Sequence, residues 1–203
     1  MTRMSFPFVE QALTLKPRPH QIEAVEALSS APHPFAFAEM SVASGKSLVM
    51  ALLAQKALPQ ARTLIIAHNE DLVQQDAKAC EWIGEKPLLC ASGLGAPQVF
   101  GRLTVGTIGT ILNRVEYFRN VGVVIIDEVH RARMEPMRDG SRSQYLQLKD
   151  ALPNAWFRGL TGTGWREDGS GSLEHTFGPK VYSYGFLEAL EDGFVKTLRA
   201  VNA

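Results

Sequence analysis

Two adjacent carboxylates, Asp127 and Glu128, directly follow a run of apolar residues, Val123 to Ile126. A continuous apolar run of this kind is typical of a strand that is buried on both faces, as in a parallel sheet. We expect the carboxylates where this strand leaves the sheet, which is the edge at which open α/β sheets bind ligands. One carboxylate could hold a divalent cation there while the other handles a proton.

A second group of residues able to bind a charged ligand is Ser44-Gly-Lys-Ser47, which follows a predicted strand and precedes an apolar run. Small residues let backbone N–H groups surround a phosphate, and the N-terminus of the next helix adds positive potential. In such a loop Lys46 would contact the phosphates and the Ser47 hydroxyl would ligate magnesium. This stretch therefore predicts a phosphate-binding loop.

The full pattern G-x-x-x-x-G-K-[ST] of such loops is not met. Met40 stands where the first glycine would be, and Ala43 stands where many loops of this kind carry glycine. These two departures put the geometry of the loop amides in doubt. The order of strand, loop and helix nevertheless supports the assignment.

Strands alternate with helices along the chain, which predicts an α/β fold: a doubly wound, mostly parallel sheet with helices on both faces. We expect strands at 35–40, 62–67, 87–90, 103–107, 123–126, 156–160 and 181–184. Helices are expected to start at Pro19, after Lys46 and near Asp71, and to span 108–115, 144–152 and 186–192. Residues 170–180 are expected to form a glycine-rich loop, and Gly193 to end the last helix.

Length and composition limit the classes of protein to which the chain can belong. With 203 residues the chain can form one domain with a substantial core. Lys+Arg and Asp+Glu balance at 21 each, so a nucleic-acid surface would have to be a local patch. Cys80 and Cys90 are too few and too far apart for a zinc site, and we expect two buried, reduced thiols. No signal peptide or membrane-spanning run is seen, which favours a cytoplasmic protein without a membrane partner.

Six motifs occur in a fixed order along the chain: Arg18-Pro-His-Gln21, Ser44-Gly-Lys-Ser47, Leu64-Ile-Ile-Ala-His68, Thr104-Val-Gly-Thr107, Ile126-Asp-Glu-Val-His130 and Leu160-Thr-Gly-Thr163. This order resembles the first RecA-like motor domain of superfamily 2 helicases, a P-loop NTPase fold. The closest likeness is to the DEAH/DExH-type branch with restriction-enzyme translocation subunits and repair helicases. The last motif departs from the usual Leu-Thr-Ala-Thr-Pro at Gly162 and Gly164, which would make that loop more flexible.

This resemblance implies ATP and Mg²⁺ as cofactors and assigns a role to each motif. Adenine would be bound by Arg18 and Gln21, and the phosphates by Ser44, Gly45, Lys46 and Ser47. The metal would be held by Ser47 and Asp127, and the catalytic residues would be Lys46, Asp127 and Glu128, with Glu128 deprotonating the attacking water. Coupling between sites would involve His130, Thr161 and Thr163, and the nucleic-acid backbone would be contacted by His68, Asn69, Thr107 and Arg114.

Several of these roles have simpler alternatives that the sequence leaves open. Gln21 could be only a solvated residue in the first turn of a helix, and His130 only a hydrogen-bonded loop histidine. The polar residues assigned to nucleic acid could serve solubility alone.

The predicted function is an ATP-dependent helicase or translocase, acting on DNA rather than RNA. Residues 1–17 would be an N-terminal lead, 18–195 the ATP-binding domain and 196–203 the start of a linker. That linker would lead to a second RecA-like domain in the same longer chain, without which ATP hydrolysis would be weak. The alternative is a free-standing nucleotide-binding or interaction module without catalysis. A small-molecule kinase would need a lid and an acceptor site, for which the sequence shows no candidate.

Overall fold

The structure is a computed structural model that describes residues 16–137, 139–166 and 171–193. Within these residues the chain forms one seven-stranded sheet in which all neighbouring strands are parallel. The strands are β1 (Phe35–Met40), β2 (Arg62–Ala67), β3 (Leu88–Cys90), β4 (Leu103–Thr107), β5 (Val121–Asp127), β6 (Trp156–Thr161) and β7 (Lys180–Tyr184). Their order across the sheet is β3-β4-β2-β5-β6-β1-β7, with β3 and β7 at the edges.

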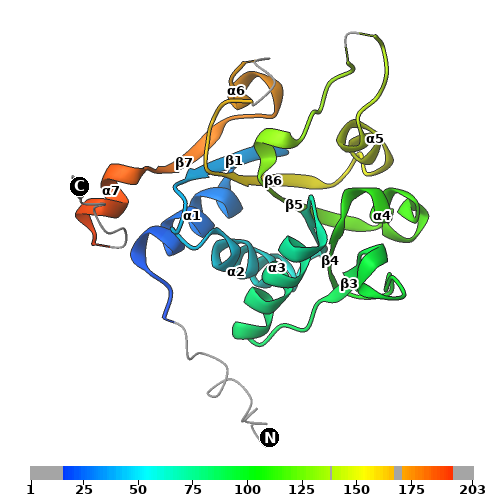
Figure 1. The fold of residues 1–203 in the computed structure, drawn as a ribbon, viewed down its shortest axis with the longest axis horizontal. Coiled ribbons are helices and arrows are strands. Elements are labelled where there is room, and N and C mark those ends of the chain that lie inside the picture. The colour runs from blue at the N-terminus through cyan, green and yellow to red at the C-terminus, as the bar shows by residue number, and fades with distance from the viewer. Residues whose placement is uncertain (1–15, 138, 167–170, 194–203) are drawn as a thin grey trace, which may run out of the picture.

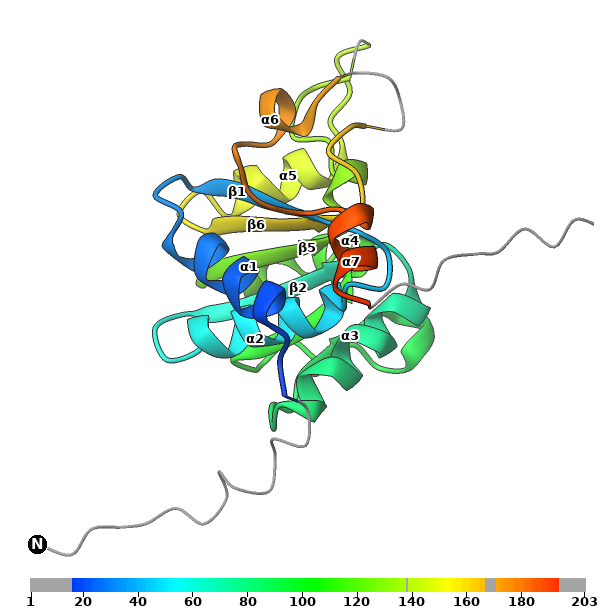
Figure 2. The same cartoon turned by 90° about the vertical axis from the view of Figure 1, so that its left-hand side faces the viewer.

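Helices cover both faces of the sheet, as expected for a doubly wound fold (Figures 1 and 2). One face carries α1 (Pro19–Ser30), α2 (Lys46–Ala57), α3 (Glu70–Trp82) and the short α7 (Phe186–Glu191). The other carries α4 (Ile108–Leu112), α5 (Gln144–Ala151) and α6 (Leu173–Thr176). Three 3₁₀ turns lie at Ser92–Leu94, Val115–Phe118 and Val129–Arg131.

The core is divided by the sheet because successive strand residues point to opposite faces. In β2, Ile65 and Ala67 pack in the cluster formed with α1, α2 and α3, whereas Leu64 and Ile66 pack in the cluster formed with α4 and α5. All four side chains are fully buried. A strand buried on both faces has no polar face, which is why β2 and β5 read as continuous apolar runs.

The parallel register brings the carboxyl ends of the central strands to one edge. Asp127 at the end of β5 lies opposite Leu160 of β6, and Thr161 of β6 lies opposite Glu39 of β1. The loops that follow β1, β2, β4, β5 and β6 therefore all emerge on the same side, and they contain the motifs singled out in the sequence.

Most expected elements are found near their predicted bounds, and the differences are local. The sheet is parallel throughout in the described residues, where a mostly parallel one was predicted. The expected 170–180 loop contains the helical turn α6, and the helix expected at 108–115 ends at Leu112. Gly193 has a φ of +74° after α7, which confirms the predicted helix end. Both cysteines are buried and unpaired.

The predicted domain limits remain predictions. Residues 1–15 of the expected N-terminal lead and all of 196–203, the expected linker, lie outside the described residues. In the part of the chain that the structure describes, no helix combines the length and apolar character needed to cross a membrane.

Candidate functional site

The loop between β1 and α2 has the backbone shape of a phosphate-binding loop. Ala43 and Gly45 adopt left-handed conformations, with φ of +66° and +84°, and α2 begins directly afterwards at Lys46. Left-handed geometry suits glycine and is strained for alanine. The sequence departure at Ala43 thus falls at a position where glycine would be the relaxed residue, and the loop keeps its turn despite the alanine.

Two side chains of α1 hold this loop. His20 Nε2 lies 3.0 Å from the carbonyl oxygen of Ser44, and Gln21 Nε2 donates to the same oxygen at 2.9 Å. The other end of the Gln21 amide accepts a hydrogen bond from the Arg18 backbone N–H at 2.9 Å. Gln21 is 4 % exposed, so the alternative of a solvated helix residue is wrong. A side chain at Gly45 would collide with the Gln21 amide, because a Cβ there would lie 2.3 Å from Nε2.

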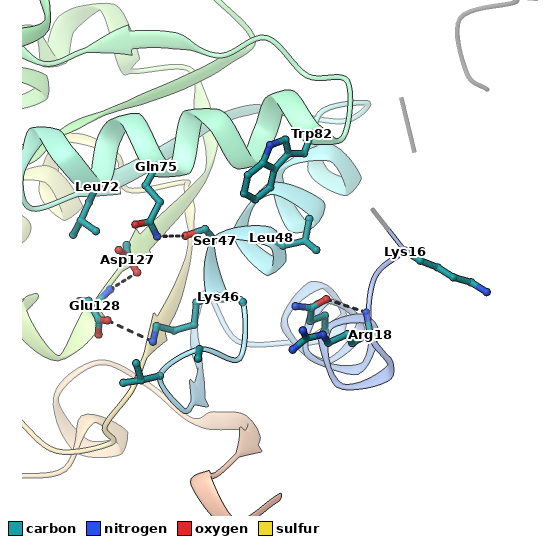
Figure 3. Close-up of a pocket in the computed structure, with 14 residues that line it drawn as sticks. Lys16, Arg18, Lys46, Ser47, Leu48, Leu72, Gln75, Trp82, Asp127 and Glu128 are labelled. Atoms are coloured by element: carbon teal, nitrogen blue, oxygen red, sulfur yellow. Dashed lines mark hydrogen bonds and ion pairs between the residues drawn. The ribbon is translucent and has the colours of Figure 1, made fainter. Parts of the chain in front are cut away.

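The lysine of the loop and the two carboxylates converge, as Figure 3 shows. Lys46 Nζ lies 3.6 Å from Glu128 Oε1, and the Glu128 backbone N–H donates to Asp127 Oδ1 at 3.0 Å. Glu128 has a φ of +49°, a left-handed conformation that is unusual for a residue with a side chain. Strained backbone of this kind clusters at functional sites, where the surrounding structure enforces it.

A cavity of about 480 Å³ opens beside these groups. Among its lining residues are Arg18, Gln21, Gly45, Lys46, Ser47, Asp127 and Glu128, all of which the sequence had singled out. Ser44 is a fully buried residue of the loop, and its carbonyl oxygen is the atom that His20 and Gln21 of α1 contact. The structure therefore gathers the predicted nucleotide-site residues in one place, while their roles in binding and hydrolysis stay predictions.

The sequence reasoning missed three residues of α3 that belong to this site. Gln75 donates from Nε2 to the Ser47 hydroxyl at 2.9 Å, and Trp82 lines the cavity. Asp76 is 1 % exposed and neither of its carboxylate oxygens has a hydrogen-bond partner in the described residues. One signal was present in the sequence: Asp76 follows the buried Val73 by three residues, so it falls on the apolar face of the helix.

Negative charge accumulates at this end of the sheet. Burial, together with the smaller effects of the Asp127 and Glu128 charges, raises the pKa of Asp76 to about 8, against the nearby Ser47 hydroxyl, which lowers it. Burial and the Glu128 charge also raise the pKa of Asp127 to about 6, against the attraction of Lys46. Three carboxyl groups thus share one nearby lysine, so Asp76 keeps its proton below its raised pKa, and a bound cation would favour the charged form instead.

These residues fit a magnesium ion that arrives with a phosphate ligand. The carboxylate of Asp127 and the Ser47 hydroxyl line the cavity and are oxygen donors of the kind that Mg²⁺ prefers, and the buried carboxyl group of Asp76 lies near both. Among the described residues no three His, Cys, Asp or Glu side chains form a metal cluster by themselves. Magnesium commonly binds through one or two carboxylates together with water and substrate phosphates, which suits this arrangement.

A hydrogen-bonded network joins the carboxylates to the loop after β6. His130 Nδ1 lies 2.8 Å from the Thr161 hydroxyl and 3.2 Å from Glu128 Oε2. The Thr161 hydroxyl also contacts the carbonyl of Thr163 at 3.0 Å, and the Gly162 N–H points to Glu128 at 3.4 Å. The predicted partners His130 and Thr161 therefore touch, and Thr163 joins them through its main chain. Whether this network couples two sites stays a prediction.

Three of the four residues predicted to contact nucleic acid lie along a separate groove of about 660 Å³. His68, Asn69 and Thr107 line this groove, but Arg114 is not among its lining residues and instead donates to the Thr110 carbonyl at 3.4 Å. Asn69 caps α3 by accepting from the Leu72 N–H at 2.9 Å, so it has a structural role as well. Ser92, Thr110 and Gln144 also line the groove and were not predicted.

Comparison with solved structures identifies the fold. The UvsW helicase from bacteriophage T4 superimposes with a TM-score of 0.65 at 23% identity, over 83% of this chain and 60% of that one. A hypothetical ATP-dependent RNA helicase from Sulfolobus tokodaii gives 0.64 at 17% identity, over 87% and 56%. The type ISP restriction-modification enzyme LlaGI, solved with a DNA substrate mimic, gives 0.63 at 14% identity, over 90% and 21%. At these identities the likeness concerns the fold alone.

The chain spans at most 60% of the length of these three proteins. Among curated protein sequences none matches it significantly. A protein-family model does match, over residues 14–166, and it describes the res subunit of type III restriction enzymes. This match covers well over half of the chain and contains every motif from Arg18 to Thr163. The chain therefore belongs to the type III restriction enzyme res-subunit family, and its sheet has the RecA-like α/β fold seen in the helicases that it resembles.

Proposed function

We propose that this chain is the ATP-binding motor domain of a nucleic-acid-dependent helicase or translocase, which hydrolyses ATP with magnesium when joined to a second RecA-like domain. The observation that carries the proposal is the convergence of Lys46, Asp127 and Glu128 at the mouth of the phosphate loop, with 3.6 Å between Lys46 Nζ and Glu128 Oε1. An ion pair at this position holds both side chains where a triphosphate would enter.

In the proposed mechanism the loop amides from Ser44 to Ser47 and the N-terminus of α2 bind the β- and γ-phosphates. Lys46 leaves Glu128 to neutralise phosphate oxygens, which frees the Glu128 carboxylate to orient a water and accept its proton. Ser47 and Asp127 would hold magnesium, with Asp76 behind them. Magnesium, when bound, neutralises charge that develops on the transferred phosphoryl group.

The isolated domain is expected to bind ATP and to hydrolyse it poorly. In comparable phosphoryl-transfer enzymes an arginine supplied from outside the site accelerates the reaction by roughly 10³ to 10⁵. A second RecA-like domain would supply such a group, and reading the gene beyond codon 203 tests for it directly. A free-standing binding module would instead have a natural stop codon at this point.

The test of the mechanism separates binding from chemistry. With Lys46→Ala the chain should lose Mg²⁺-ATP binding in calorimetry, whereas Glu128→Gln should keep it. In the full product of the gene, Glu128→Gln should abolish nucleic-acid-stimulated hydrolysis. Normal hydrolysis by that variant would remove Glu128 as the base, and unchanged ATP binding by Lys46→Ala would refute the nucleotide site.

DNA is proposed over RNA because the family model describes a restriction-enzyme subunit, whose substrate is DNA. The similar solved structures include both a DNA-bound restriction enzyme and RNA helicases, so they do not favour either. Binding of the full gene product to single-stranded and duplex DNA and RNA, measured across salt concentrations, is the direct test. A preference for RNA at all salt concentrations would contradict the proposal.

A further inference from the structure

We propose that Trp82, the last residue of α3, is the stacking surface for the nucleobase, and that the base subsite lies between Trp82 and Arg18. This inference rests on the proposed function, since it assumes a nucleoside triphosphate with its phosphates at Lys46 and Ser47. It adds the part of the site that would recognise the base, and it assigns this recognition to stacking on the face of the Trp82 ring.

The position of Trp82 is unusual for an apolar side chain of this helix. Val73, Ala77 and Cys80 of α3 are buried, whereas Trp82 is 43 % exposed and lines the nucleotide cavity. Figure 3 shows the Trp82 ring near Leu48, with Arg18 on the same side of the view and Lys46 and Glu128 on the other, and all of them line one cavity. A nucleotide with its phosphates at the loop would therefore extend its base toward Trp82 and Arg18.

The chemistry of these two side chains suits a base. An exposed indole presents a large flat apolar surface, and a purine ring would cover it by stacking. A guanidinium can stack on the opposite face of the same ring, since it is planar and weakly hydrated. Both contacts recognise a π-face, which adenine and guanine share.

The hydrogen bonds of Gln21 support a base subsite of this kind. This residue would be the expected reader of the adenine edge, yet its Nε2 donates to the Ser44 carbonyl and its Oε1 accepts from the Arg18 backbone. Both ends of the amide are thus fixed by protein groups, and the structure gives it the role of a loop clamp. Each end of the amide keeps one further hydrogen-bonding position, so stacking on the surrounding side chains would supply the rest of the base recognition that we propose.

The experiment compares four ligands with magnesium on the 203-residue chain: ATP, GTP, UTP and inorganic tripolyphosphate. Trp82→Ala should weaken ATP and GTP binding alike, by about tenfold or more, because aromatic stacking on a base contributes ~1–3 kcal/mol. Binding of tripolyphosphate should be unchanged, since it has no base. Trp82→Phe should restore most of the affinity, and UTP should bind less tightly than the purine nucleotides to the unmodified chain.

Trp156→Ala is the matched control, because Trp156 has a similar exposure of 42 % but lines a different cavity. It should leave the affinity of all four ligands unchanged. A direct readout is the fluorescence of Trp82 in a Trp156→Phe, Trp165→Phe background, which ATP and GTP should quench and tripolyphosphate should not.

Equal affinities for ATP in the Trp82→Ala and unmodified chains would overturn the inference. So would a Gln21-dependent preference for ATP over GTP that Trp82→Ala does not alter. The proposed function fails in a different way: neither ATP nor tripolyphosphate would then bind the unmodified chain, or Lys46→Ala would not affect binding.

Discussion

Asp76 introduces a proton equilibrium into the folded chain. Its pKa is raised to about 8 from an ordinary value of 3.8, so the folded state holds a proton that the unfolded state releases. Stability must then fall as pH rises between these two values, because over that range the unfolded state binds fewer protons. Asp127, with a pKa of about 6, adds to this slope only at lower pH.

We therefore expect Asp76→Asn to raise the stability of the ligand-free chain at pH 8 and to flatten its pH dependence. The gain should be about 1–2 kcal/mol, which corresponds to a rise in Tm of roughly 2–8 °C for a chain of this size. Thermal unfolding between pH 6.5 and 8.5 measures it. Asp71→Asn is the control, because Asp71 is an exposed residue of the same helix. A flat profile for the unmodified chain would contradict the prediction.

Ala43 is a residue whose backbone conformation should lower the free energy of unfolding. At a φ of +66° its Cβ is strained by about 1–2 kcal/mol, and its exposed methyl group contributes little packing. Ala43→Gly relieves this strain, although glycine also gains entropy in the unfolded chain, worth ~0.4–1 kcal/mol. The net effect should be a stabilisation of up to about 1 kcal/mol with ATP affinity retained.

Chemical denaturation measures the Ala43→Gly effect, and Ala61→Gly serves as the comparison. Ala61 lies in the turn before β2, where its φ is negative, so glycine brings only the entropic loss. If both substitutions destabilise the chain equally, the left-handed conformation at Ala43 is not strained.

At the scale of elements, the site depends on how α1 is docked. His20 stacks on Tyr184 of β7 at 4.0 Å between ring centroids, and both His20 and Gln21 bond to the phosphate loop. This helix therefore links Tyr184 of the edge strand β7 to Ser44 in the loop after β1, which are 140 positions apart in sequence (184 − 44). The loop does not hold its shape from local sequence alone.

Gln21→Ala should accordingly weaken binding of inorganic tripolyphosphate as well as ATP, because it removes the clamp on Ser44. Loss of a buried hydrogen-bonded amide should also lower the free energy of unfolding by about 1–3 kcal/mol. Ile22→Ala, at the neighbouring exposed position, is the control. A residue that only read adenine would leave tripolyphosphate binding intact, and that outcome would refute the clamp.

The elements themselves were largely predictable because their signals are local. The apolar runs of β2 and β5, Pro19 at the start of α1 and Gly193 after α7 each indicate one structure. Contacts between side chains of different helices, strands and loops could not be predicted from the sequence. Gln75 and Trp82 line the cavity, and Asp76 lies near Ser47 and Asp127, only because α3 packs on α2. The contact of Gln21 likewise depends on a loop 23 residues away.

At the scale of the whole molecule, the cavity beside Lys46 and the groove beside His68 open on the same edge of the sheet. The cavity lies beside the loops after β1 and β5, and the groove beside those after β2 and β4. The contacts of His130 with Glu128 and Thr161 connect the cavity to the loop after β6. Thr161 is fully buried and its hydroxyl reaches both the histidine and the carboxylate region.

Thr161→Val preserves the shape of this side chain and removes its hydroxyl, so it tests whether the contact couples hydrolysis to nucleic acid. In the full product of the gene we expect ATP affinity and basal hydrolysis to be kept, and stimulation by nucleic acid to fall by about 5- to 100-fold. Thr63→Val, at a position 2 % exposed in β2, controls for the loss of a buried hydroxyl. If Thr161→Val only lowers the unfolding free energy, by ~1–2 kcal/mol, while stimulation persists, then His130 is a structural loop histidine and the coupling signal must take another path.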